Sequence, residues 1–79
     1  MTEELLTIIS QNIYSQNRQT IMELTLRSDD KRIYTTEIPG VEFPNIAKEF
    51  GLTLYSDIVG MEAVASIQDG GIRSIRKAV

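Results

Sequence analysis

Glycine and proline residues interrupt this chain at short intervals after residue 38, and these breaks limit what it can fold into. They stand at Pro39, Gly40, Pro44, Gly51, Gly60, Gly70 and Gly71. Because both residue types end helices and strands, the chain divides into short elements. Its 79 residues suffice for one domain. A chain of this length buries only about 60% of its unfolded surface, so we expect a single domain over residues 1–79 with a thin core.

Residues 3–16 are predicted to form a helix. Thr2 can cap it, and Glu3 and Glu4 in the first turn favour the helix dipole. On a helix, an apolar stripe would cover about 160° of the circumference; its members are Leu5, Leu6, Ile8, Ile9 and Ile13. Asn12 falls inside this stripe. Asn12 would lie either at a partly solvated edge of the stripe or in a helix–helix interface, where its amide would fix the register of two copies.

Residues 20–38 are predicted to form a β-hairpin. Met22, Leu24 and Leu26 alternate with polar residues, as in a strand with one buried face. Residues 32–38 are rich in strand formers. An odd-length loop with a bulge would place the apolar residues of both strands on one face. We therefore expect three cross-strand pairs: Met22 with Ile38, Leu24 with Thr36, and Leu26 with Tyr34.

A second, shorter helix is predicted for residues 44–51. Pro44 suits its first turn, Gly51 its C-terminal end, and Leu52 can fold back onto it. Residues 52–79 are ambiguous, because residues 61–68 alternate like a strand while Ile58, Met61, Val64 and Ile67 also have helical spacing. We favour a second hairpin that turns at Asp69-Gly70-Gly71.

These elements predict an α+β fold with the order α-β-β-α-β-β. The sheet would be antiparallel and four-stranded, with the helices on one face.

The composition excludes much chemistry. The chain contains no Cys and no His, so it lacks the thiolates and imidazoles of most zinc sites and catalytic triads. No phosphate-binding or nucleophile-elbow motif occurs. Asp29-Asp30 could start a metal loop, but the further oxygen ligands are missing, and a solvated turn is the better interpretation. We expect a protein that is not an enzyme, with no cofactor and no metal.

Residues 43–60 faintly suggest a helix-turn-helix motif. Ala47, Phe50 and Gly51 occupy workable places. The would-be recognition helix, residues 54–59, has no Lys or Arg, and Asp57 would face the phosphates. A small DNA-binding regulator is therefore the alternative hypothesis rather than the first.

Charge is unevenly distributed along the chain. Residues 1–70 hold all eleven acids and five of the eight bases, whereas residues 71–79 hold three bases and no acid. Arg73, Arg76 and Lys77 are therefore the predicted partner-binding residues, joined across the sheet by Tyr34. The competing interpretation is a solvated terminus, or charges that pair with the acidic residues of the rest of the chain.

The thin core also predicts a homo-oligomer, most simply a dimer. We assign its interface to the wide stripe of the first helix, at Leu5, Ile9, Asn12 and Ile13. The acidic N-terminus differs from a basic signal peptide, and no stretch reaches the length of a membrane span, which favours the cytoplasm.

The sequence alone thus favours a small protein-binding module that regulates or inhibits a larger macromolecule. It binds another protein or itself, with nucleic acid a less favoured partner and no membrane.

Overall fold

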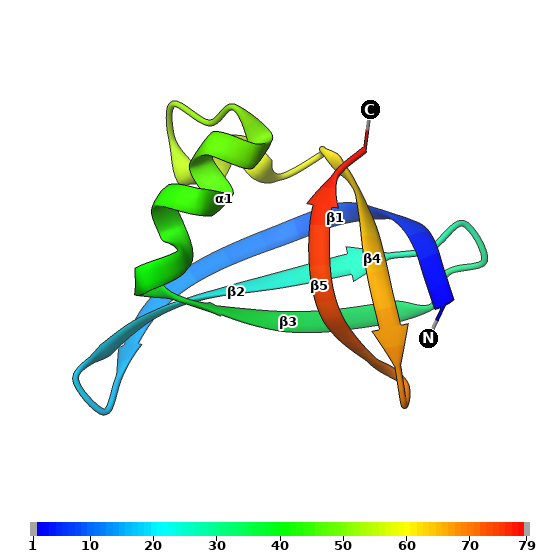
Figure 1. The fold of residues 1–79 in the computed structure, drawn as a ribbon, viewed down its shortest axis with the longest axis horizontal. Helices are drawn as coiled ribbons and strands as arrows, with labels where there is room; N and C mark the ends of the chain where they lie inside the picture. The colour runs from blue at the N-terminus through cyan, green and yellow to red at the C-terminus, as the bar shows by residue number, and fades with distance from the viewer. Residues whose placement is uncertain (1, 79) are drawn as a thin grey trace.

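The computed structural model describes residues 2–78, which form five strands, one α-helix and two short 3-10 helices (Figure 1). Strands β1, β2 and β3 come first, then the helices, then strands β4 and β5. Their bounds are β1 Thr2–Gln16, β2 Gln19–Arg27, β3 Ile33–Pro39, η1 Gly40–Glu42, α1 Phe43–Phe50, η2 Tyr55–Ile58, β4 Glu62–Gln68 and β5 Gly71–Lys77.

The predicted helix at residues 3–16 is wrong, because this segment is the long strand β1. The α+β prediction falls with it: the sheet has five antiparallel strands, and one short α-helix accompanies them. A β-bulge at Ile9 explains the error. Leu6 and Ile8 face the core before the bulge, and Ile13 lies opposite buried Met22 after it. The bulge shifts the alternation by one residue, so the apolar spacing imitates a helix.

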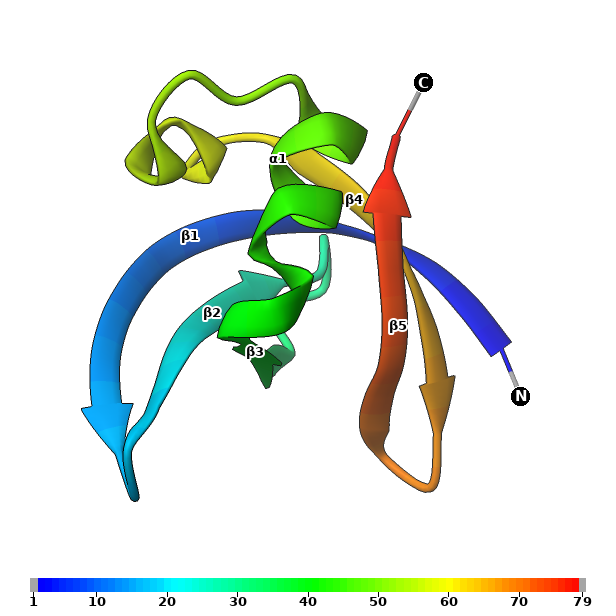
Figure 2. The same cartoon turned by 60° about the vertical axis from the view of Figure 1, so that its left-hand side comes forward.

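Strand β1 changes partners along its length. Residues Thr2–Thr7 pair with β4, and residues from Thr7 onward pair with β2. The sheet order is consequently β3-β2-β1-β4-β5. Figure 2 shows β1 as one continuous arc, with β2 along one end and β4 along the other. The strand therefore belongs to both halves of the sheet.

The core lies between these two halves. In Figure 1, β4 and β5 run across the direction of β2 and β3. Their facing side chains form one cluster of buried apolar residues, to which α1 adds Phe43 and Phe50 and η2 adds Ile58. The five strands form one antiparallel sheet in this order, and α1 lies in the connection between β3 and β4. Connectivity alone does not specify a function.

The predicted hairpin of β2 and β3 is confirmed, including its register. Met22 pairs with Ile38, Leu24 with Thr36 and Leu26 with Tyr34. The loop between the strands is closed by the backbone N–H of Ser28, which donates to the Arg32 carbonyl at 2.9 Å. Lys31 takes a positive φ of 68° within it. The odd-length loop follows from the requirement that apolar residues of both strands share one face.

The shorter helix and the second hairpin are also confirmed. Helix α1 ends at Gly51, which has a left-handed φ of 66°, and the Leu52 N–H returns to the Ala47 carbonyl at 2.9 Å. Strands β4 and β5 meet through a turn in which Asp69 and Gly70 both have positive φ. Asp-Gly is a favoured pair for such a two-residue turn. Within residues 2–78, none of the helices has the length and apolar character needed to cross a membrane.

We predict that Phe50→Ala lowers the free energy of unfolding by about 3–5 kcal/mol, because it empties a site in the core. Phe50 is only 1% exposed. Lys48→Ala, an exposed change on the same helix, serves as the control and is expected to shift the same quantity by less than about 0.5 kcal/mol. Denaturant titration measures both. Equal effects would mean that α1 does not pack on the sheet.

Candidate functional site

The three predicted partner-binding bases lie on β5 but do not form one patch. Arg76 lies opposite Val64 and forms an ion pair with Glu3 at 2.8 Å. Lys77 lies opposite buried Ala63 and therefore belongs to the other face of the strand. Its backbone N–H donates to the Glu49 carboxylate.

Both arginines of this set are engaged within the chain. Arg73 donates to the Gln68 side chain at 3.0 Å. The hydrogen bond and charge of Arg76 lower the pKa of the Glu3 carboxyl below its usual value, and Glu3 in turn raises the pKa of Arg76. Arg76, one of the three C-terminal bases, is thus paired with an acid from the rest of the chain. This pairing agrees with the competing interpretation of these charges.

Tyr34 belongs to a different cluster, between the β2–β3 loop and the start of β1. Its hydroxyl donates to Glu4 and accepts from Arg32, and Arg32 also pairs with Glu4 at 2.6 Å. Partial burial and the bond to Glu4 raise the pKa of Tyr34. Asp30 accepts from the Ser28 hydroxyl and from Arg32, and both interactions lower its pKa. These interactions hold the β2–β3 loop against β1. The Asp30 carboxylate takes part in them through its bonds to Ser28 and Arg32.

The predicted oligomer residues do not share one face, because β1 is a strand. Leu5 lies opposite Val64 in β4, Asn12 opposite Glu23 in β2, and Ile13 opposite Met22. Ile9 is the extra residue of the bulge. Leu5, Ile9 and Ile13 nevertheless remain among the exposed large apolar residues.

The helix-turn-helix motif lacks its second helix. Residues Tyr55–Ile58 form a 3-10 helix of four residues, and the Asp57 carboxylate accepts from the Leu54 N–H at 3.0 Å. The Phe43 and Tyr55 rings pack with their centroids 5.2 Å apart. The segment therefore packs against α1, and a single short turn does not offer the length that a recognition helix presents to a groove.

An acidic face covers the outer side of β2 and β3; we define it by Glu23, Glu37 and Tyr14. Glu23 and Glu37 are direct cross-strand neighbours, an arrangement in which like charges repel. The Tyr14 hydroxyl donates to Glu37. Two carboxylates on this face would repel phosphates.

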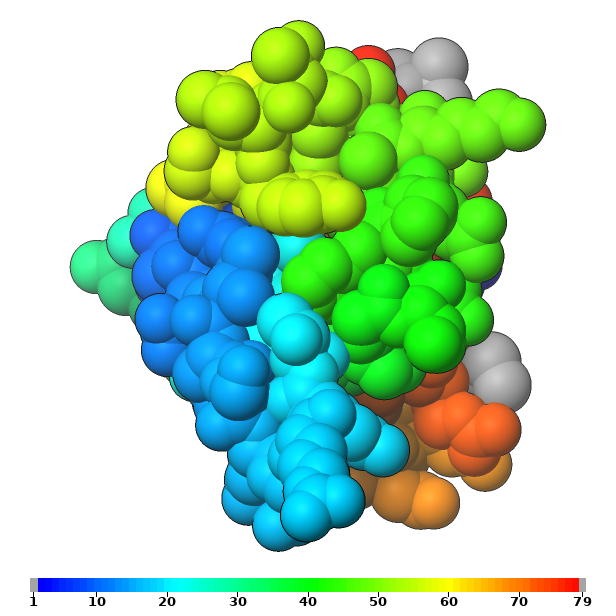
Figure 3. All heavy atoms as spheres, turned by 90° about the vertical axis from the view of Figure 1, so that its left-hand side faces the viewer, coloured from blue at the N-terminus to red at the C-terminus, as the bar shows by residue number. Residues whose placement is uncertain are grey.

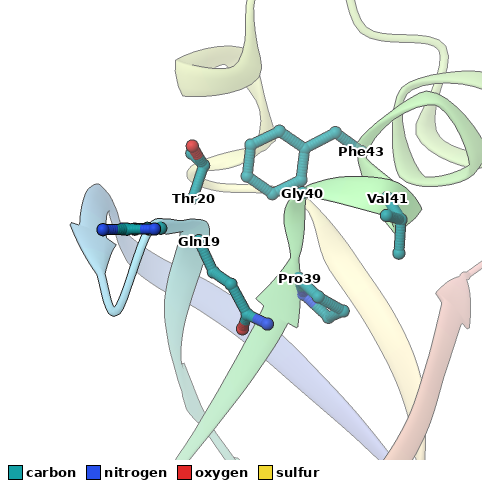
Figure 4. Close-up of a pocket in the computed structure, with 7 residues that line it drawn as sticks. Gln19, Thr20, Pro39, Gly40, Val41 and Phe43 are labelled. Atoms are coloured by element: carbon teal, nitrogen blue, oxygen red, sulfur yellow. The ribbon is translucent and has the colours of Figure 1, made fainter.

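A hollow of about 570 Å³ lies where the β1–β2 turn approaches η1. We call it the turn hollow. Figure 3 shows the surface depressed between the β1–β2 hairpin and the segment of η1 and α1. In Figure 4, β2 residues line one side of the hollow, and the segment from the end of β3 to α1 lines the other. Its lining residues are Arg18 of the β1–β2 turn, Gln19 and Thr20 of β2, and Pro39, Gly40, Val41 and Phe43 of the other segment.

Two side chains of the turn hollow stand out physically. Val41 is 83% exposed, more than any other large apolar residue in the described part of the chain. Arg18 has a φ of 64°, in the left-handed region that residues with a Cβ seldom adopt. The turn places Asn17 and Arg18 between paired Gln16 and Gln19, and glycine is the usual second residue of such a turn.

Sequence reasoning missed both residues, because only folding brings residue 18 beside residue 41. The sequence signal for this turn was the polar pair Asn17-Arg18 between β1 and β2. The predicted helix over residues 3–16 concealed it. Comparison of the chain with family models, with curated proteins and with solved structures gives no match. The functional argument therefore rests on the geometry.

We predict that Glu37→Gln lowers the pKa of Tyr14. The hydrogen bond to Glu37, with partial burial and the charges of Glu37 and Glu23, raises this pKa from 10.0 to about 12. The hydrogen bond from Tyr14 to Glu37 therefore stabilises the folded chain below pH 10, and this contribution is lost as the pH rises through 12. Near-ultraviolet titration of tyrosine ionisation, with Tyr14→Phe as the reference, measures the shift. Glu42→Gln is the control, and an unchanged Tyr14 titration in Glu37→Gln would contradict the assignment.

Proposed function

We propose that this chain is a non-enzymatic protein-binding module, a regulator or inhibitor that contacts its partner at the turn hollow. The hollow receives an apolar side chain of the partner protein, and Arg18 meets a carboxylate beside it. The observation that carries the proposal is Val41, which is 83% exposed at a hollow that Pro39 and Phe43 also line. Covering this apolar surface is favourable, and aromatic and arginine side chains are enriched at protein interfaces.

The backbone at Arg18 supports the same site. A non-glycine residue in the left-handed region costs roughly 1–2 kcal/mol. Strained residues of this kind concentrate at functional sites. Arg18 forms no ion pair among the interactions of the described residues, so its guanidinium is free to meet a carboxylate.

Chemistry and electrostatics favour binding over catalysis or nucleic-acid recognition. The turn hollow is lined by no carboxylate, and the chain contains no Cys or His, so a general base is missing there. Glu23 and Glu37 disfavour phosphates on the outer face of the sheet. The helix-turn-helix alternative has no further support, because η2 is a single short turn. A cytoplasmic location forms part of this proposal, on the sequence grounds above.

The proposal predicts that Val41→Glu weakens partner capture at least about tenfold, the loss typical of a central interface residue. The tagged chain is used to capture proteins from a lysate of its source organism. Ile33→Glu is the matched control, because Ile33 is an exposed apolar residue on β3 at a different part of the surface. We expect this variant to retain the partner.

A photo-crosslinking residue placed at position 41 or at position 33 locates the contact. We expect the partner to crosslink at position 41 only. Arg18→Gly relieves the backbone strain, so it is expected to keep or raise the free energy of unfolding while weakening capture. Two results would overturn the assignment of this site. One is an equal loss of partner capture in Val41→Glu and Ile33→Glu, and the other is a crosslink at position 33 alone.

A further inference from the structure

The sheet has several edges in the described residues, and nearly all carry features that discourage pairing with another chain. Strand β5 presents three bases and a bulge opposite Ser66 and Ile67. Strand β3 carries Glu37 and ends at Pro39. The first half of β1 contains Glu3 and Glu4, and Arg32 reaches across to Glu4. Charges, prolines and bulges are the usual means of protecting an edge.

The second half of β1, which follows the bulge at Ile9, contains none of these features itself. Residues 10–16, Ser-Gln-Asn-Ile-Tyr-Ser-Gln, contain no charge and no proline. Their strand pairing is with β2 on one side only, since the pairing of β1 with β4 ends at Thr7 and the backbone hydrogen bonds of β1 with Gly60 and Met61 are made by Ile8. An edge of this kind presents alternate unpaired N–H and C=O groups. It is suited to accepting another strand.

We propose that this edge binds the same edge of a second copy, so that two chains form one continuous antiparallel sheet about a two-fold axis. The segment is self-complementary when the axis passes through Ile13. Ile13 then lies opposite Ile13 of the second copy, Asn12 opposite Tyr14 and Gln11 opposite Ser15. The two apolar side chains, each 40% exposed in the single chain, cover one another. Directly opposed apolar pairs stabilise antiparallel strands.

Charge selects a second copy over a different strand. The chain carries a net charge of −3, yet this edge is neutral, so two copies meet there without opposing like charges. It also offers no ion pair to a charged partner. A two-fold interface requires the same patch on both chains, and residues 10–16 meet that requirement. The proposal is independent of the turn hollow, whose Arg18 and Val41 take no part in it.

The test measures the mass of the full chain by light scattering, at protein concentrations in the tens of micromolar. The wild-type chain is expected to have the mass of two chains, and Ile13→Lys the mass of one, since two ammonium groups would then face each other on the axis. Ile13→Thr keeps a strand-forming residue and is expected to remain a dimer. Ile33→Lys, the same change on β3, is the matched control and also remains dimeric.

Cysteine substitution tests the register directly, because the chain has no cysteine of its own. Directly opposed residues bring their Cβ atoms to about 4.5–5.5 Å, close to the reach of a disulfide. Oxidised Ile13→Cys is therefore expected to give a covalent dimer, and Ile33→Cys is not. A single-chain mass for the wild type, a dimeric mass for folded Ile13→Lys, or equal disulfide yields at positions 13 and 33 would overturn the proposal.

Discussion

The exchange of partners along β1 is the constraint on which the rest of this structure depends. One strand, β1, serves both halves, so the two halves belong to one sheet. Thr7 pairs with Arg27 of β2 and with Glu62 of β4. The bulge at Ile9 comes shortly after it along the chain. Bulges bend and twist a strand. The bend lets the two halves face each other and enclose a core between them.

The same arrangement determines which surfaces remain for binding. Since each half of β1 has one strand partner, each half also has an open edge. The first half carries glutamates and lies near the β2–β3 loop, whereas the second half is neutral and unpaired. Helix α1 and η1 follow β3 directly, and Gly40 allows η1 close to β2: a Cβ there would lie 3.2 Å from the Thr20 carbonyl oxygen. The turn hollow results from this close approach.

Local patterns predicted most of the elements after residue 19. The alternation of Met22, Leu24 and Leu26 determined both the strand and its register, since a shift of one residue would expose all three. Pro44 and Gly51 marked the helix, and Asp69-Gly70 marked the last turn. The first strand was not predictable in this way, because a bulge cannot be recognised from one sequence and it converts a two-residue period into an apparent helical one.

The candidate sites depended on contacts between distant residues, which explains why the sequence predicted them less well. Arg76 is a conspicuous base in the sequence, but its partner Glu3 lies at the other end of the chain. Arg18 and Val41 are inconspicuous until the β1–β2 turn meets η1. Ile9 and Ile13 were assigned to an interface for a helical reason that is wrong. The exposure of Ile13 on the open edge of β1 is instead part of the argument for the proposed two-fold interface.

Amide hydrogen exchange along residues 2–16 tests the central claim, that β1 is one strand that changes partners, most directly. The measurement uses the Ile13→Lys variant, so that association does not protect the open edge. We expect the amides of both Thr7 and Ile8 to be protected from exchange. On either side of them, protected and exchanging amides should alternate, because each half of β1 has only one neighbouring strand. An unbroken run of protected amides through residues 7–16 is the pattern of a helix and would contradict the account.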